Sequence, residues 1–366
     1  MAGGERALNI SVISYSLPVV GEKRGGIERV AHELAHELAR RGHCVEVWTH
    51  DPKPEGAAYE VRELPWKRFA TSWLGRRLTM GYLGNVLALL PKYGDADVII
   101  AIGDSLLLPL AGKPLVRVMA GSALGEALCA RTPWRFALQT GVYVQELATA
   151  LTQTGCVGIS HNTRRYNPFV RRTIPLGVDL SAFSPHPAGK TTEPSILFVG
   201  ALDGRKRGRL LIEWFTKEVR ARHPAATLSM VCQPGPQVAG VTYHVGVTDD
   251  ELARMYRSAW VYASPSTYEG FGLPYLEALA SGTPVVATSN PGSLEVLDGG
   301  RYGLLPADVE FGAALAGLLS DEAERARLAA LGLERARLYT LAAMADGYED
   351  LLAEVAGPRA GLGKVI

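Results

Sequence analysis

Short runs of apolar residues alternate along this chain with longer stretches in which apolar residues recur every three or four positions. The short runs predict β-strands, and the periodic stretches predict amphipathic helices. In the first half, strands are predicted at 8–13, 45–48, 98–101, 116–119, 156–160 and 173–175, and helices at 26–41, 71–92 and 134–154. In the second half, strands are predicted at 196–200, 227–232, 260–263 and 285–287, and helices at 208–221, 249–257, 274–281 and 307–356.

Such alternation is typical of parallel sheets with helices on both faces, so we predict an α/β fold with two doubly wound, Rossmann-like units. Between the two series, residues 177–194 have no apolar period, and Pro185 and Pro187 exclude a helix interior or a central strand there. We therefore expect one domain at 1–183 and a second from 184 to 340. Ligands of such sheets bind beyond the carboxyl ends of the strands, which makes the cleft between the domains the expected site.

Composition fits a chain with two hydrophobic cores and argues against several classes of protein. Of the 366 residues, 47% are hydrophobic, and the formal net charge is only +1. We find no apolar run long enough for a membrane span, no secretory leader and no nucleic-acid-binding motif. The cysteines are isolated from one another, which gives neither a zinc signature nor a disulfide framework. We expect a cytoplasmic protein.

The most informative segment contains two glutamates, Glu269 and Glu277, eight positions apart. A Gly-x-Gly turn (Gly270, Gly272) lies between them, and Pro274 suits the first position of a helix. Free backbone N–H groups and the positive end of the helix dipole make such a helix start an anion site, and the glycines let a ligand come close. Two carboxylates that accept from hydroxyl groups beside an anion site suit a sugar esterified to a diphosphate.

In their order and spacing, the motifs of this chain resemble the GT-B-fold retaining glycosyltransferases of family 4 (glycosyl transferases group 1). The resemblance covers nearly the whole chain. It rests on these stretches: Gly25-Gly26-Ile27-Glu28-Arg29, Gly177-Val178-Asp179 with Phe183 and Pro185, Gly200 to Gly208, and Glu269 to Glu277 with its continuation to Val286. It implies two domains that face a central cleft, and a C-terminal segment, 341–366, whose helix packs back on the N-terminal domain.

The same resemblance assigns roles to residues. It implies that Glu269 contacts the donor sugar, that Glu277 holds the ribose hydroxyls, and that Glu269 and Lys206 are the catalytic residues. A basic cluster after a strand can neutralise the charge that develops on a departing diphosphate. The further donor-binding residues that it implies are Gly25, Gly26, Arg205, Val247, Gly270, Phe271, Gly272 and Leu273. No metal site and no obligatory cofactor are implied, since the nucleotide diphosphate sugar is itself the donor substrate.

Two positions depart from the family pattern. Many members have an arginine directly after the strand glycine, where this chain has Ala201, and Arg205 is the candidate substitute. Many members also place a histidine after the strand predicted at 116–119, where this chain reads Ala120-Gly121-Ser122. These departures leave open a non-catalytic protein that binds a nucleotide sugar and has kept the fold.

Two other signals point to different chemistry. His32 and His36 fit the His-Glu-x-x-His pattern of zinc proteases, but helical spacing places both opposite Leu34, on the solvent face. We therefore interpret them as surface histidines. Aromatic and basic residues interleave at 66–77, which leaves open a peripheral contact with the inner face of a membrane as well as a buried helix.

Taken together, the sequence predicts a retaining hexosyltransferase that moves a hexose from a nucleotide diphosphate sugar to a hydroxyl acceptor. A UDP-sugar is favoured as donor and a GDP-sugar stays open, because the backbone contacts expected at the base leave little trace in side chains. The acceptor is not identified by any motif.

Overall fold

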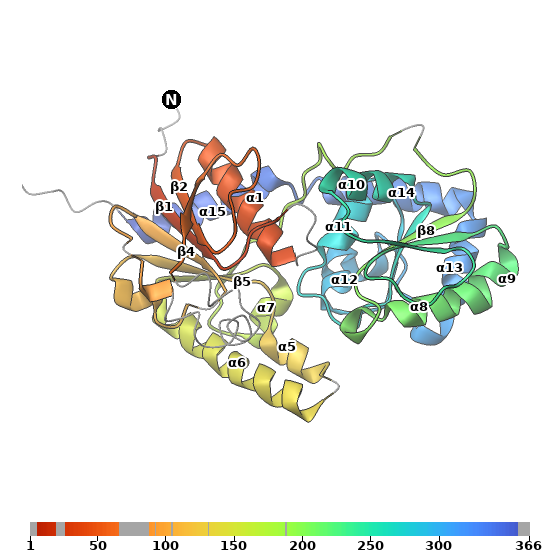
Figure 1. The fold of residues 1–366 in the computed structure, drawn as a ribbon, viewed down its shortest axis with the longest axis horizontal. Coiled ribbons are helices and arrows are strands. Elements are labelled where there is room, and N and C mark those ends of the chain that lie inside the picture. Colours follow the sequence, from red (N-terminus) through yellow and green to blue (C-terminus); the bar gives the residue numbers. More distant parts are fainter. Residues whose placement is uncertain are drawn as a thin grey trace, which may run out of the picture.

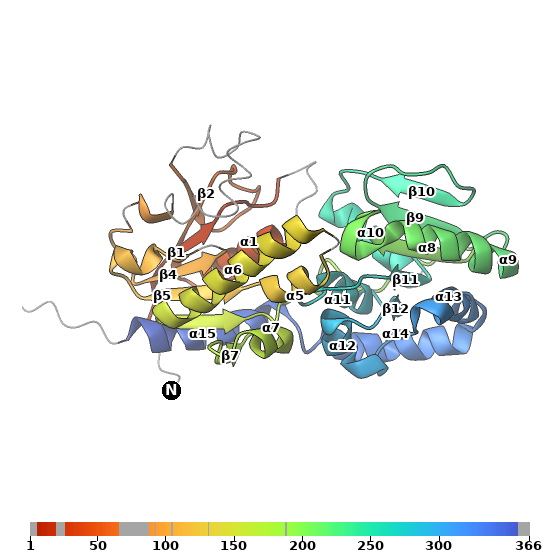
Figure 2. The ribbon, with the colours of Figure 1, turned by 90° about the horizontal axis from the view of Figure 1, so that it is seen from below.

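The computed structural model describes residues 6–19, 26–65, 88–91, 93–103, 105–130, 132–186 and 189–357. These residues form two α/β lobes that lie side by side in both ribbon views (Figures 1 and 2). Each lobe contains a parallel sheet with helices packed on it. The predicted α/β class with two doubly wound units is therefore confirmed.

The sheet of the first lobe has the strand order β3-β2-β1-β4-β5-β6-β7. Its strands are β1 (Asn9–Ser14), β2 (Cys44–Thr49), β3 (Glu60–Glu63), β4 (Val98–Ile102), β5 (Leu115–Met119), β6 (Gly155–Gly158) and β7 (Arg172–Thr173). Its helices are α1 (Gly26–Arg40), η2 (Leu108–Ala111), α5 (Ala123–Leu128), α6 (Pro133–Thr152) and α7 (His161–Tyr166). The central strands β4 and β5 are buried along their whole length, which explains why β4 is a continuous apolar run and β5 is apolar except at Arg117.

The sheet of the second lobe has the strand order β10-β9-β8-β11-β12. Its strands are β8 (Ser195–Val199), β9 (Thr227–Val231), β10 (Val241–His244), β11 (Val261–Ser264) and β12 (Val285–Ala287). The helices that follow the strands are η3 (Gly204–Lys206), α8 (Gly208–Trp214), η4 (Phe215–Val219), α9 (Arg220–Arg222), α10 (Asp249–Ser258), α11 (Leu273–Ala280), α12 (Pro291–Val296), η5 (Asp298–Gly300), η6 (Asp308–Glu310), α13 (Phe311–Ser320) and α14 (Glu322–Ala336).

The last described helix, α15 (Leu341–Ala356), lies on the first lobe although it follows the second in sequence (Figure 1). It packs against α1, and Arg41 at the end of α1 pairs with Asp346 at 2.6 Å and with Glu349 at 2.5 Å. The chain therefore crosses between the lobes twice.

Several elements differ from the expected pattern. The edge strands β3 and β10 were not predicted, because neither contains a buried apolar run. The predicted tail helix at 307–356 is divided into α13, α14 and α15, and the helix predicted at 208–221 contains a π-helical turn, η4. Most of the helix predicted at 71–92 lies outside the described residues.

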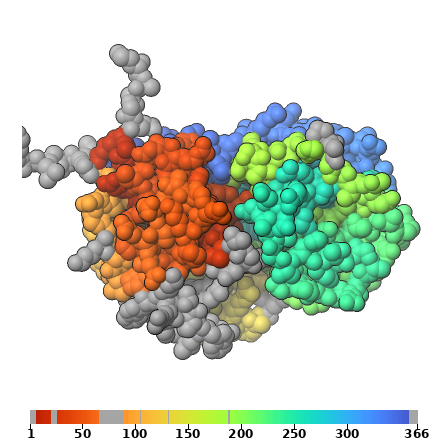
Figure 3. Space-filling model, turned by 45° about the horizontal axis from the view of Figure 1, so that its top comes forward, coloured from red at the N-terminus to blue at the C-terminus, as the bar shows by residue number. Residues whose placement is uncertain are grey.

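The two lobes contact each other near loops that follow strands of the first sheet. After β5, the backbone N–H of Ser122 donates to the Tyr268 hydroxyl at 3.1 Å. After β6, the backbone N–H of His161 donates to the Glu295 carboxylate at 2.9 Å. In the space-filling view, the first lobe (red and orange) lies directly beside the second (green) (Figure 3). The loops that carry the candidate site residues are thus brought to this boundary.

Candidate functional site

The loop between β11 and α11 reaches the boundary between the lobes, and its glycines allow it to do so. Gly272, the N-cap of α11, has a φ of 100°, and a Cβ there would also clash with the Tyr275 ring. A Cβ on Gly270 would lie 2.6 Å from the Ala120 carbonyl oxygen of the first lobe. Side chains at these two positions would therefore distort the helix start or push the lobes apart.

Glu269 lies in this loop, buried between two cations. Its Oε2 accepts from Arg205 Nη1 at 2.8 Å, and its Oε1 pairs with Lys206 Nζ at 2.5 Å. Burial by itself would raise the pKa of this carboxyl, but the charges of Lys206 and Arg205 outweigh burial and hold the pKa below its usual value. Glu269 is therefore a carboxylate, and the three side chains together carry one net positive charge.

The two cations come from a turn that follows β8. Arg205 and Lys206 belong to η3, whose backbone is joined to the glutamate loop by a hydrogen bond from the Thr267 N–H to the Arg205 carbonyl, at 2.9 Å. Arg205 also donates to the Tyr268 carbonyl at 2.6 Å. These bonds fix the basic turn beside the start of α11, so the cations and the dipole of the helix favour the same anion.

Glu277 lies inside α11 and is 4% exposed. Its Oε1 accepts from Nη1 of Arg29 at 2.5 Å, and Arg29 belongs to α1 of the first lobe. Burial raises the pKa of the neighbouring Tyr256 phenol far above its usual value, and the charge of Glu277 raises it further. Glu277 is thus an acceptor that is already occupied by an arginine of the other lobe.

The other predicted donor residues lie in different environments. Gly26 begins α1, where an added Cβ would touch Leu273 at 3.5 Å, and Gly25 lies outside the described residues. Phe271 and Leu273 are buried, so a ligand could meet only their backbone. Val247 is half-buried just before α10 and packs against the hydrophobic core. The structure therefore brings Glu269, Arg205 and Lys206 into one cluster, while Glu277 pairs with Arg29 of the first lobe.

Two residues at this site had no role in the sequence-based assignment. Arg29 was part of a motif but its partner, Glu277, is 248 positions away. Tyr268 inserts its ring against Gly125, and its hydroxyl donates to the Ser122 carbonyl at 3.3 Å while accepting from the Ser122 N–H. Both contacts cross between lobes, so no local pattern in the sequence could reveal them.

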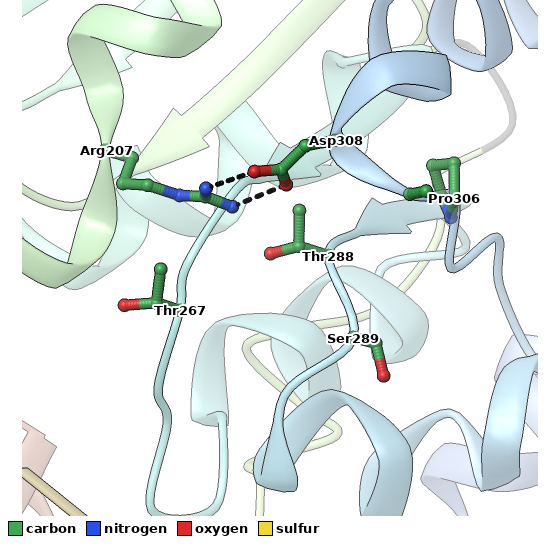
Figure 4. A pocket seen from close by; sticks show the side chains of 7 residues that line it. Arg207, Thr267, Thr288, Ser289, Pro306 and Asp308 are labelled. Carbon is green, nitrogen blue, oxygen red and sulfur yellow. Dashed lines mark hydrogen bonds and ion pairs between the residues drawn. The ribbon is translucent and has the colours of Figure 1, made fainter. Parts of the chain in front are cut away.

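A separate pocket lies close to the basic turn (Figure 4). It has a volume of about 310 Å³ and a polar lining that includes Arg207, Thr267 and Asp308. Arg207 makes two hydrogen bonds to Asp308, at 2.6 and 2.9 Å, and donates from Nε to the Pro265 carbonyl at 2.5 Å. Because its charge is neutralised by Asp308, we do not assign an anion to this pocket.

The two histidines of the His-Glu-x-x-His pattern are half-buried, where we expected solvated surface side chains. His32 Nδ1 is 2.8 Å from the Tyr59 hydroxyl, and His36 Nδ1 accepts from the Ala58 N–H at 3.3 Å. Burial lowers the pKa of His32 to about 4, with a smaller contribution from the charge of His36. Within the part of the chain that the structure describes, no group of three or more potential metal ligands is found. Both histidines therefore serve to pack the segment before β3 onto α1.

Family comparisons match both halves of the chain. Residues 193–321 match the family described as Glycosyl transferases group 1, and residues 24–124 match Glycosyltransferase Family 4. D-inositol 3-phosphate glycosyltransferase from Corynebacterium jeikeium is 31% identical over 226 residues, which is 52% of this chain and 52% of that protein. This match therefore spans about half the length of that relative. MMP alpha-(1->4)-mannosyltransferase from Mycolicibacterium hassiacum is 27% identical over 379 residues, covering 85% of this chain and 90% of that protein.

Solved structures resemble the whole fold. Sucrose-phosphate synthase from Thermosynechococcus elongatus has a TM-score of 0.78 at 22% identity, covering 95% of this chain and 98% of that one. The Anabaena protein HepE in complex with UDP and glucose has a TM-score of 0.72 at 17% identity, covering 94% and 99%. At these identities the likeness concerns the fold alone, and it confirms the GT-B arrangement. Among the described helices, none is both long enough and apolar enough to cross a membrane.

Proposed function

We infer a specific reaction for this chain from its family. The chain belongs to glycosyltransferase family 4 (glycosyl transferases group 1), whose members transfer sugars from nucleotide sugars. The proposed reaction moves a hexose from a nucleotide diphosphate hexose to a hydroxyl acceptor, with retention of anomeric configuration. We favour UDP as the nucleotide and keep GDP as the alternative. The observation that carries the proposal is Glu269, buried and ionised between Arg205 and Lys206 at the start of α11.

The charges of this cluster suit a diphosphate. Arg205 and Lys206 share one carboxylate, so one positive charge remains for the ligand, and the dipole of α11 adds to it. As the bond between the sugar and the phosphate breaks, negative charge grows on the leaving diphosphate. A cation that is already in place stabilises this charge without reorganisation. Lys206 and Arg205 are therefore the proposed groups that stabilise the leaving phosphate.

The two glutamates would divide the donor between them. A carboxylate only accepts hydrogen bonds, so it suits the hydroxyl groups of a sugar. We assign the hexose to Glu269 and the ribose to Glu277, with the backbone of Gly270 to Leu273 beside the diphosphate and Val247 beside the base. Because no second carboxylate is evident as a nucleophile, the acceptor hydroxyl would attack on the face of the leaving group, and the leaving phosphate would take its proton.

The lobes would have different tasks. In this proposal residues 1–183 shape the acceptor side, residues 184–340 bind the donor, and 341–366 return to the first lobe. UDP and glucose in the HepE complex and the mannosyltransferase among the relatives support a hexose donor. We also propose a cytoplasmic location, since all four cysteines are free. The aromatic and basic stretch at 66–77, on which a peripheral membrane contact would depend, lies outside the described residues.

One experiment separates catalysis from binding alone. The purified chain is incubated with UDP-hexoses and GDP-hexoses, with and without candidate hydroxyl acceptors, and released nucleotide and product are measured. An enzyme should release nucleotide, while Glu269→Gln should fold, keep nucleotide binding and lose most turnover. If the chain bound a nucleotide sugar tightly but released no nucleotide with any acceptor or with water, the non-catalytic alternative would be correct.

A further inference from the structure

We propose that Arg29 competes with the ribose of the donor for Glu277: it holds this carboxylate while the cleft is empty and must release it when a nucleotide binds. Arg29 would then set the donor affinity and couple donor binding to the movement of the lobes. The inference rests on the proposed role of Glu277 and goes beyond it, because it concerns a residue of the opposite lobe.

Arg29 and Glu277 form a close, largely buried ion pair. Arg29 Nη1 lies 2.5 Å from Glu277 Oε1, and the two side chains are only 18% and 5% exposed. A ribose hydroxyl that donates to the same oxygen needs the space that the guanidinium fills. Binding of the ribose to Glu277 and pairing of Glu277 with Arg29 are therefore alternatives.

Arg29 also pairs with a second glutamate, Glu33. Its Nε donates to Oε1 of Glu33 at 2.9 Å, through a different nitrogen from the one that contacts Glu277. Glu33 lies four residues further along α1, so this pair does not depend on how the lobes sit. When Glu277 accepts from a ribose, Arg29 would keep its hydrogen bond to Glu33. Glu33 thus makes the exchange possible.

Arg29 also lies where the two lobes and the segment between them meet. Its guanidinium carbon lies 5.0 Å from the ring centroid of Phe183, which is fully buried in the segment that joins the two lobes. One side chain therefore contacts α1, the connecting segment and α11. Loss of the contact with Glu277 would remove an attraction that holds the lobes together, and this is how donor binding would be coupled to lobe movement.

The test uses binding to the full-length chain. Calorimetry measures the affinity for UDP and GDP, and for their 2′,3′-dideoxy counterparts, which lack the hydroxyls assigned to Glu277. Arg29→Gln removes the competitor and should bind the ribonucleotide about fivefold more tightly or better, the lower end of ordinary coupling between sites. Glu33→Gln leaves Glu277 as the one carboxylate that pairs directly with Arg29 among the described residues, and this variant should bind the ribonucleotide more weakly. For both variants, the affinity for the dideoxy nucleotide should change less than the affinity for the ribonucleotide.

The residue that directly follows α1 provides a matched control. Arg41 forms a similar half-buried pair with Glu349, but on the side of α15 and away from Glu277. Arg41→Gln should leave the affinity for nucleotide unchanged. Thermal unfolding of each variant shows whether it is folded, and the opposite signs expected for Arg29→Gln and Glu33→Gln separate competition from a general loss of stability.

The outcomes distinguish this inference from the proposed function. If Glu277→Ala keeps the preference of the wild type for ribonucleotide over dideoxy nucleotide, the ribose role of Glu277 is wrong and the competition has no basis. If Glu277→Ala abolishes that preference but Arg29→Gln binds UDP or GDP no more tightly, only the competition is overturned. Weaker ribonucleotide binding by Arg29→Gln would identify Arg29 as a donor contact and would also overturn it.

Discussion

Replacing Lys206 with alanine removes one of the two cations that flank Glu269. This substitution tests whether Lys206 stabilises the leaving phosphate. Lys206 Nζ lies 2.5 Å from Glu269 Oε1 and is 16% exposed, so its charge acts in a partly desolvated site. If the lysine meets the leaving phosphate only as charge develops there, the loss falls mainly on the transition state. Removal of one preorganised group that stabilises such charge typically costs about 2.7–4 kcal/mol, or about 100- to 1,000-fold in kcat.

Steady-state kinetics with a saturating acceptor measures the effect. We expect kcat of Lys206→Ala to fall about 100-fold or more, with a much smaller change in KM. Arg209→Ala is the matched control, since Arg209 belongs to the same basic stretch but is exposed and pairs with Asp203 at 2.9 Å. Its kcat should stay within about twofold of the wild type, as usual for a surface pair of little energetic weight. A rise in KM with unchanged kcat would show that Lys206 only binds the donor, and the catalytic assignment would be refuted.

Three further predictions concern other parts of the site. Glu277→Ala should weaken nucleotide binding about tenfold or more by calorimetry, because charge-assisted hydrogen bonds contribute about 1.5–3 kcal/mol each; unchanged affinity would remove Glu277 from the donor site. Burial raises the pKa of Glu33 from 4.5 to about 7, although Arg29 opposes the shift. The folded chain then holds this proton more tightly than the unfolded chain. The free energy of unfolding of the wild type should therefore fall as the pH rises from 4.5 to 7. Thermal unfolding at pH 5 and 8 should show a smaller loss for Glu33→Gln, and equal losses would contradict the assignment. Gly270→Ala should reduce turnover and lower the melting temperature, because its Cβ would lie 2.6 Å from the Ala120 carbonyl; normal activity would mean that the loop can move away from the first lobe.

The features that the sequence predicted well are those that a few adjacent residues determine. The buried central strand β4 is a continuous apolar run because both faces of a parallel sheet are covered. The start of α11 was also predictable, since Gly272 and Pro274 are a local signal for a helix start. Edge strand β3 was missed because one of its sides lacks a partner strand and its residues are largely exposed.

The features that the sequence could not predict depend on contacts between elements that are far apart in the sequence. The glutamate motif suggested two acceptors for a ligand, but it did not show that Arg205 and Lys206 meet Glu269 or that Arg29 meets Glu277. The interpretation of His32 as a solvated surface residue was only partly right for the same reason: helical periodicity gives the face of α1, but not the segment with Tyr59 that partly covers this face. Periodicity describes one element at a time, and these contacts join elements that are distant in sequence.

The anomeric configuration of the product tests whether this chain transfers a hexose with retention. The wild-type chain is supplied with an α-linked UDP-hexose or GDP-hexose and an acceptor that supports turnover, and proton NMR follows the anomeric signal of the product from the first minutes. The account predicts an α-linked product, because Glu269 holds the hexose while the acceptor hydroxyl attacks from the side of the leaving diphosphate. A β-linked product would contradict both the same-face reaction and the roles assigned to the site.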